Sequence, residues 1–228
     1  MPELVVVEPL RPSMDEVGAR ALWYPLAEIV TPRMRSKGKY ANDYPRGAVV
    51  HFTAGRDQTE EQARNSVHHG RENGYVYFVI GPTGQVYQAC PLNEWGYHAE
   101  ESHWPGLGNG VSSKLVGIEI TNAGKLTLER KSWFGVQYAR TETREVNLDH
   151  DCPPGLYKKY TPDQEAALIN LLLWLHCNNP TVFNFSYVLG HHEVSGVKGI
   201  GFWRKNDPGG ALSMTMEGLR KLLMDRLA

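Results

Sequence analysis

Apolar runs predict strands at three places in the middle of the chain. Residues 47–53, GAVVHFT, form the continuous β-branched run that is typical of a buried strand. In residues 115–121, LVGIEIT, the aliphatic side chains alternate with Gly117 and Glu119, which therefore point to the opposite face of the predicted strand. Residues 75–88 place two apolar runs around the turn sequence GPTG, so they predict a hairpin.

Helical spacing of apolar residues, together with capping signals, predicts helices between and after these strands. The clearest helix begins at Thr161, a good N-cap residue, and continues through Pro162 into four leucines at helical spacing. Residues 57–72 form a second helix, which Gly74 ends. We also expect helices at 14–23 and 215–227, a short strand at 187–189, a loop at 31–46, and a loop with minor structure at 122–160.

Strands that alternate with helices along one chain indicate an α/β fold, a central mixed β-sheet flanked by helices. The hairpin excludes a purely parallel sheet. A length of 228 residues allows one large domain. We therefore expect a single domain over residues 45–228, with residues 1–44 as an N-terminal extension that packs on it.

Composition and charge exclude several classes of protein. The net charge is −1, with 24 basic and 25 acidic side chains, which argues against a polybasic binder of nucleic acid or membrane surfaces. The longest apolar stretch, residues 166–175, is too short to span a membrane. Three widely spaced cysteines predict neither a disulfide scaffold nor a cysteine-rich zinc module. The acidic N-terminus lacks the features of a secretory signal, so we expect synthesis in the cytoplasm without one.

Histidines follow two of the predicted strands, where a rigid sheet can present side chains to a cleft. His51 lies at the end of the first strand, and His191 follows the strand at 187–189. Asp207 lies on a loop constrained by glycine and proline. Two imidazoles and a carboxylate with a free fourth position form the ligand set of a hydrolytic zinc site. Spacing alone leaves open that these histidines are ordinary core or surface residues.

Four groups of motifs, in order over about residues 45–227, resemble the type 2 N-acetylmuramoyl-L-alanine amidases. This zinc family includes AmpD-type enzymes, phage lysozyme-type amidases and the animal peptidoglycan recognition proteins. The resemblance implies their fold. The motifs are GAVVHFTAGRD at 47–57, GYVYFVIGPTGQVYQ at 74–88, WGYHAE at 95–100 with LVGIEIT at 115–121, and GHHEVSG with KNDPGG near the C-terminus.

The resemblance implies one zinc ion per chain, bound by His51, His191 and Asp207. It also implies that Glu119, in the GIE strand motif, is the catalytic acid and base, as in the AmpD-like branch. Lys205, two residues before the aspartate, would stabilise the developing oxyanion. Aspartate as third ligand and glutamate as base occur together in that branch, so the two assignments agree.

Three further residues are expected to bind substrate. His98 lies in a stretch that resembles the WHAG element of the family, which lines the substrate groove. Tyr77 and Trp95 are the expected aromatic contacts. Among the aromatic residues near His98, which are Trp95, Tyr97 and Trp104, stacking on sugar or peptide and core packing are equally good explanations. The segment 192–206 is longer than the family's usual loop, and its Phe202 and Trp203 predict a lip over the groove.

The expected function is therefore zinc-dependent hydrolysis of the amide between N-acetylmuramic acid and L-alanine in bacterial peptidoglycan. A lytic role, as in an endolysin or an antibacterial effector, would place its action at the cell wall or periplasm. The alternatives are a cytoplasmic enzyme that recycles muropeptides, a hydrolase of the same fold that cuts another amide, and a non-catalytic peptidoglycan-binding protein. We expect no nucleic-acid partner and no membrane span, and the sequence makes no prediction of oligomeric state.

Overall fold

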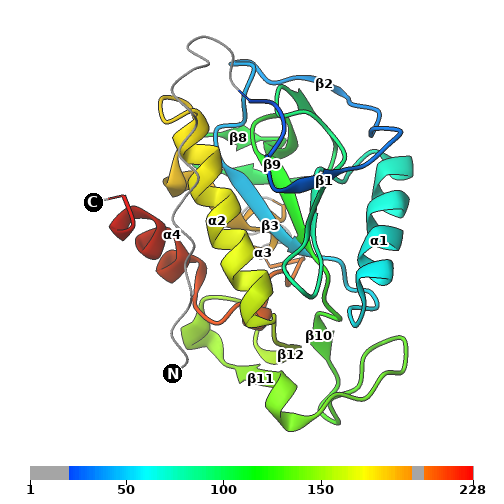
Figure 1. Cartoon of the computed structure of the whole chain (residues 1–228). Coiled ribbons are helices and arrows are strands. Elements are labelled where there is room, and N and C mark those ends of the chain that lie inside the picture. Colours follow the sequence, from blue (N-terminus) through cyan, green and yellow to red (C-terminus); the bar gives the residue numbers. More distant parts are fainter. Residues whose placement is uncertain (1–20, 197–202, 228) are drawn as a thin grey trace.

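A six-stranded mixed sheet forms the centre of the protein (Figure 1). The structure is a computed structural model, and it describes residues 21–196 and 203–227. The strand order is β1-β5-β4-β9-β3-β13, in which β4 and β5 form the antiparallel pair and the other pairs are parallel. The strands are β1 (Ala27–Ile29), β3 (Ala48–Phe52), β4 (Phe78–Ile80), β5 (Val86–Gln88), β9 (Val116–Ile120) and β13 (Val188–Gly190). The predicted α/β fold with a central mixed sheet is confirmed.

The parallel pairing of three neighbouring strands fixes the position of the chemistry. In β3 and β9, His51 is paired with Glu119, so both side chains lie on the same face of the sheet. On the other side of β3, Gly190 of β13 is paired with Val50. The residues that end or follow these strands therefore meet at one edge, the carboxyl edge, where ligands bind in α/β sheets.

The helices form because capping and apolar spacing agree. α1 (Glu60–Asn73) begins with a capping box at Thr59, and α2 (Pro162–Asn178) begins with another at Thr161. The last helix is α4 (Met216–Asp225). In Figure 1, α2 crosses one face of the sheet, next to α4, while α1 lies toward the β1 side. The predicted helices at 57–72 and 215–227 and the helix beginning at Thr161 are confirmed within a few residues.

The two faces of the sheet bury different amounts of apolar surface. Val50, Val116 and Ile118 point into the main core, which also contains the leucines of α2. On the other face, a smaller cluster that includes Val49 and Leu115 supports the edge that carries His51. One face thus supplies most of the hydrophobic stabilisation, and the other carries the chemistry.

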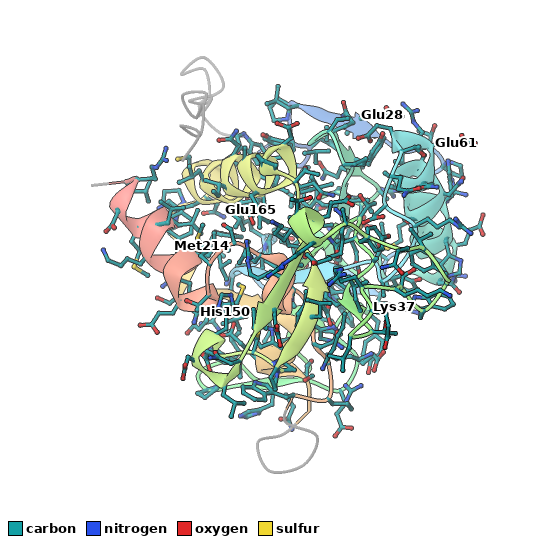
Figure 2. All side chains as sticks on the ribbon, turned by 90° about the horizontal axis from the view of Figure 1, so that it is seen from below. Glu28, Lys37, Glu61, His150, Glu165 and Met214 are labelled. Carbon is teal, nitrogen blue, oxygen red and sulfur yellow. The ribbon has the colours of Figure 1, made fainter. Side chains whose placement is uncertain are left out.

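An ion pair joins α1 to the edge of the sheet. Arg64 of α1 contacts Glu28 of β1, with Nη2 and Oε2 3.0 Å apart. Seen from below, Glu28 and Glu61 of α1 lie on the same side of the molecule, away from His150 (Figure 2). Because both side chains of the pair are about half exposed, it adds little to stability.

The loop predicted at 122–160 is wrong in part, because this region folds into a three-stranded antiparallel sheet below the central one. Its strands, β10 (Lys125–Leu126), β12 (Gly155–Lys158) and β11 (Thr143–Val146), have two to four residues each. In these strands only Leu126, Val146 and Tyr157 are buried. With so few buried positions, the sequence shows no alternation of apolar and polar residues that would predict these strands.

Small elements complete the fold. Residues 31–46, predicted as a loop, contain one short strand that pairs with β6. The remaining strands are β2 (Gly38–Lys39), β6 (Glu94–Trp95), β7 (His103–Trp104) and β8 (Gly108–Asn109). The short helices are η1 (Val111–Ser113), η2 (Arg140–Glu142), η3 (Leu148–His150), η4 (Phe185–Tyr187), α3 (His191–Val194) and η5 (Gly209–Ala211).

The described part of the N-terminal region packs on the same core. β1 joins the central sheet, and Tyr24, Met34 and Tyr44 are buried in the main cluster. The helix predicted at 14–23 lies mostly outside the described residues, and 21–23 are not helical. A domain boundary at residue 44 remains a prediction. Cys90, Cys152 and Cys177 form no disulfide bond. Within the described ranges, every helix is too short or too polar to cross a membrane.

Candidate metal centre and catalytic cleft

Two histidines reach the carboxyl edge of the sheet from paired strands. His51 is the fourth residue of β3, a strand in which every residue is buried. His191 directly follows β13 and begins the short helix α3. Both side chains are almost completely buried, at 2% and 5% exposure. The parallel register therefore explains how residues 140 positions apart in the chain become neighbours.

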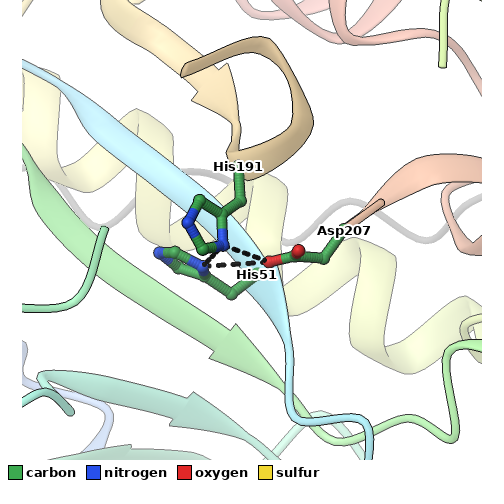
Figure 3. Close-up of side chains that lie close together, drawn as sticks. All are labelled: His51, His191 and Asp207. Atoms are coloured by element: carbon green, nitrogen blue, oxygen red, sulfur yellow. Dashed lines mark hydrogen bonds and ion pairs between the residues drawn. The ribbon is translucent and has the colours of Figure 1, made fainter. Parts of the chain in front are cut away.

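Asp207 completes a compact cluster with these two rings (Figure 3). The Nδ1 atoms of His51 and His191 are 3.1 Å apart. Asp207 Oδ2 lies 3.0 Å from Nδ1 of His51 and 2.9 Å from Nδ1 of His191. The three predicted ligands are thus brought together by the fold, each with one ligand atom directed at the same point.

The geometry of this triangle fits a metal ion. Ligand atoms about 2.0 to 2.2 Å from a tetrahedral zinc lie about 3.3 to 3.6 Å from one another, a few tenths of an ångström beyond the separations observed here. Two imidazole nitrogens and a carboxylate oxygen are also the donor types that zinc accepts. Three ligands leave a fourth position for water or substrate, as in hydrolytic sites.

The surroundings of His51 and Asp207 shift their pKa values toward the protonation states that metal binding requires. Burial, with a further contribution from His191, lowers the pKa of His51 to about 4, so its ring is neutral at pH 7. Burial opposes ionisation of Asp207, but the two imidazoles outweigh it and hold the pKa of that carboxyl well below its usual range. A neutral imidazole and an ionised carboxylate are the forms that bind metals.

Glu119 occupies the neighbouring position on the same face, next to His51 in the register of β3 and β9. Its Oε2 atom is buried and has no hydrogen-bond partner among the described residues. Burial, reinforced by the charge of Asp207, raises the pKa of Glu119 to about 8. A carboxyl group with this proton affinity can hold or release a proton near neutral pH.

Lys205 lies in the same cleft, but its ammonium group is held by an acidic partner. Its Nζ lies 2.8 Å from Oε1 of Glu100, and Arg204 contacts the other oxygen of that carboxylate at 2.8 Å. The bonds from Lys205 and Arg204 lower the pKa of Glu100 to about 2. Lys205 is therefore tethered at the rim of the cleft.

The cleft around the cluster has a volume of about 680 Å³. Of the three predicted substrate residues, His98 lines it with 7% exposure. Tyr77 has no exposed surface, and neither Tyr77 nor Trp95 is among the lining residues, so their contact with substrate remains a prediction. Tyr97, two residues after Trp95, does line the cleft and is 51% exposed.

A second cavity, of about 400 Å³, adjoins the cleft. The two share Phe52, Ala54, Tyr75 and Glu119, so Glu119 faces both. The far wall includes Trp133, which is 77% exposed and whose Nε1 donates a hydrogen bond to the Ala54 carbonyl oxygen at 2.6 Å. The cavity therefore adjoins the cleft at Glu119, and the cleft is lined by the three candidate ligands.

Three residues that position the cluster were not predicted from the sequence. The backbone N and Nδ1 of His192 both lie within hydrogen-bond distance of the Asp207 carbonyl oxygen, at 2.9 and 3.0 Å. Glu193 accepts a hydrogen bond from the Gly190 backbone N and is paired with Arg220 of α4. The GHHE sequence was the available signal for His192 and Glu193, but Asp207 and Arg220, which they contact, lie 15 and 27 positions further along the chain.

Comparison with known families and structures is consistent with this geometry. The profile of a family described as "N-acetylmuramoyl-L-alanine amidase" matches residues 41–210. No curated protein sequence matches the chain.

The lip predicted in residues 192–206 includes 197–202, which lie outside the described residues, so it remains a prediction.

Several solved structures share the fold at low sequence identity. A selenomethionine derivative of AmpD aligns with a TM-score of 0.55 and 18% identity, covering 88% of this chain and 96% of its own. AmpDh3 from Pseudomonas aeruginosa, in complex with an anhydromuramic pentapeptide, gives 0.52 and 19%, covering 90% of this chain but 65% of its own. Staphylococcus aureus hydrolase AmiA, with its ligand, gives 0.52 and 14%, covering 90% and 84%.

Proposed function

Because the chain belongs to the N-acetylmuramoyl-L-alanine amidase family, we propose that it hydrolyses the muramoyl amide of peptidoglycan with zinc bound by His51, His191 and Asp207. One observation carries this proposal: three ligand atoms within 3.1 Å of one another lie beside Glu119, whose buried Oε2 has no hydrogen-bond partner among the described residues. Zinc bound there supplies a Lewis acid that polarises the amide carbonyl and lowers the pKa of water.

Glu119 moves the proton in this proposal. Its ionised form accepts a proton from the attacking water, and the resulting carboxylic acid donates it to the nitrogen of the leaving L-alanine. The absence of a competing partner on Oε2 among the described residues supports this role, because a free oxygen can contact water. The net reaction separates the stem peptide from the sugar.

Lys205 assists by facing the oxygen on which negative charge develops. Its position in the cleft supports this role, and Glu100 holds its side chain at the rim. A positioned cation is most effective where charge appears only in the transition state.

The proposed substrate is peptidoglycan, and we propose lysis of the intact wall as the first candidate role. The two adjoining cavities, which share Glu119, support an extended substrate that occupies both. The recycling role predicts instead a preference for soluble muropeptides.

Incubation of the zinc-loaded protein with purified sacculi and, separately, with soluble muropeptides tests the proposal. Mass spectrometry of the products should detect free stem peptides that begin with L-alanine. Faster release from sacculi supports lysis, and faster release from muropeptides supports recycling. Tight binding to sacculi without peptide release would overturn the enzymatic proposal in favour of a binding protein.

A further inference from the structure

His98 makes two buried contacts in series between the sheet and the candidate metal centre. Its Nδ1 lies 3.0 Å from Nε2 of His51, and its Nε2 lies 2.9 Å from the carbonyl oxygen of Leu115. His51 then presents Nδ1, the remaining nitrogen of its ring, to His191 and Asp207. The series therefore runs from a backbone carbonyl through two rings to the candidate ligand atom.

The chemistry of these groups fixes where each proton lies. A carbonyl oxygen only accepts hydrogen bonds, so Nε2 of His98 must carry the proton that is donated to Leu115. In a neutral ring the other nitrogen, Nδ1, is then an acceptor, and Nε2 of His51 must donate to it. His51 is left with an unprotonated Nδ1, which is the form that binds a metal ion.

We propose that His98 is a positioning residue that fixes His51 as the Nε2-protonated tautomer, with its Nδ1 lone pair directed at the metal, and that it does not bind substrate directly. This inference rests on the metal site of the proposed function. It replaces the substrate-binding role that the sequence predicts for His98.

The packing around His98 holds the ring in this orientation. A Cβ atom at position 117 would lie 2.8 Å from Cγ of His98, so only glycine there leaves room for the ring on the face of β9. Tyr40 donates a second hydrogen bond to the Leu115 carbonyl oxygen at 3.1 Å. The Tyr77 ring meets the His98 ring edge to face, with centroids 6.0 Å apart. Tyr77 thus supports His98 from inside the fold.

The two histidine ligands differ in this respect. Nε2 of His51 has His98 as its hydrogen-bond partner. Nε2 of His191 is buried and has no partner among the described residues. A partner on the second nitrogen of a ligating histidine typically changes metal affinity about 10- to 100-fold. His98 is therefore the side chain whose loss should weaken metal binding without removing a ligand.

Zinc affinity of three variants tests the proposal, measured by competition with a chromophoric chelator and without substrate. His98→Leu removes both contacts and should weaken zinc binding about 10- to 100-fold. His98→Gln offers an amide oxygen to His51 and an amide N–H to Leu115, and should stay within about threefold of wild type. His103→Leu, at a histidine bonded to Asn109 away from the cleft, should bind zinc like wild type.

Nitrogen NMR of the wild-type histidine rings provides a second test that needs no variant. In the zinc-loaded protein, the His98 ring should be protonated on Nε2 and unprotonated on Nδ1. An Nδ1-protonated His98, or wild-type zinc affinity in His98→Leu, would overturn the proposal. Equal loss of affinity in the Leu and Gln variants would also overturn it, because packing alone would explain that result. These readouts do not depend on amidase activity, so failure of the proposed reaction would be seen separately.

Discussion

Asp207 and Glu119 are two carboxyl groups in one cleft, and their surroundings give them opposite proton affinities. Asp207 meets two imidazole rings at 2.9 and 3.0 Å, and its pKa lies well below the usual range. Glu119 has a buried oxygen without a partner among the described residues, and burial raises its pKa to about 8. Burial is common to both, so the difference comes from the neighbours. Such a separation supports the proposed roles of Asp207 as a ligand and of Glu119 as a proton carrier.

The largest expected effect is the loss of the ligand. Asp207→Ala leaves two imidazoles without the anionic donor, so zinc should be lost and amidase activity should fall to the limit of detection. Metal content per chain and the rate of peptide release measure both. Glu165→Gln, at another buried acid that is hydrogen-bonded to Ser213, should keep zinc and activity. Full zinc content in Asp207→Ala would remove Asp207 from the ligand set.

A substitution of Glu119 tests whether the two carboxyl groups have different roles. Glu119→Gln keeps the size of the side chain but cannot accept a proton, so we expect wild-type zinc content with kcat reduced about 10²- to 10⁴-fold. Steady-state kinetics together with metal analysis is the measurement. If Glu119→Gln lost zinc as Asp207→Ala does, the two groups would share one role and the comparison would fail.

Lys205→Met should have an intermediate effect on turnover. Removal of one charged group that faces a developing oxyanion typically costs about 10²-fold in kcat, and KM should change little. Arg204→Met is the matched control, because Arg204 contacts the same carboxylate of Glu100. Equal losses of kcat in the two variants would mean that both cations act by holding Glu100.

The smallest expected effect is on stability, and its sign follows from the raised pKa of Glu119. The folded state binds this proton more tightly than the unfolded state, in which the pKa is about 4.5. The metal-free protein therefore loses stability as pH rises from about 4.5 to 8. Glu119→Gln does not ionise and should avoid this loss, so with EDTA at pH 8 its Tm should exceed that of wild type by several degrees.

Thermal unfolding at pH 5 and pH 8 checks this expectation, because the difference between the two proteins should shrink at pH 5. Each kcal/mol corresponds to about 2 to 4 °C in a chain of this size. The exposed Glu61→Gln is the control and should show no such pH dependence. A constant difference at both pH values would show that Glu119 ionises as easily in the fold as in the unfolded chain.

The sequence predicts the central elements of the fold because their signals are local. The apolar runs around His51 and Glu119 and the capping signal at Thr161 each lie within a few residues of the element that they predict. The three-stranded sheet was missed because its strands are short and bury few side chains. Local patterns therefore identify the buried elements and miss those held mainly by pairing with distant strands.

The candidate site likewise has residues that the sequence predicts and contacts that it does not. His51, His191 and Asp207 could be proposed from strand ends and motifs, and the fold brings them together. The burial of Tyr77 and the contact of His98 with the Leu115 carbonyl depend on which strands are neighbours. No residue type or spacing records those contacts, so they could not be predicted from the sequence.

The central claim is that zinc is bound by His51, His191 and Asp207 while Glu119 stands apart from the metal. A crystal structure of the zinc-loaded protein, with anomalous differences measured on both sides of the zinc absorption edge, tests it most directly. We expect one anomalous peak within about 2.2 Å of Nδ1 of both histidines and of Oδ2 of Asp207. A peak bound by Glu119, or one that lies away from His51 and His191, would contradict the account.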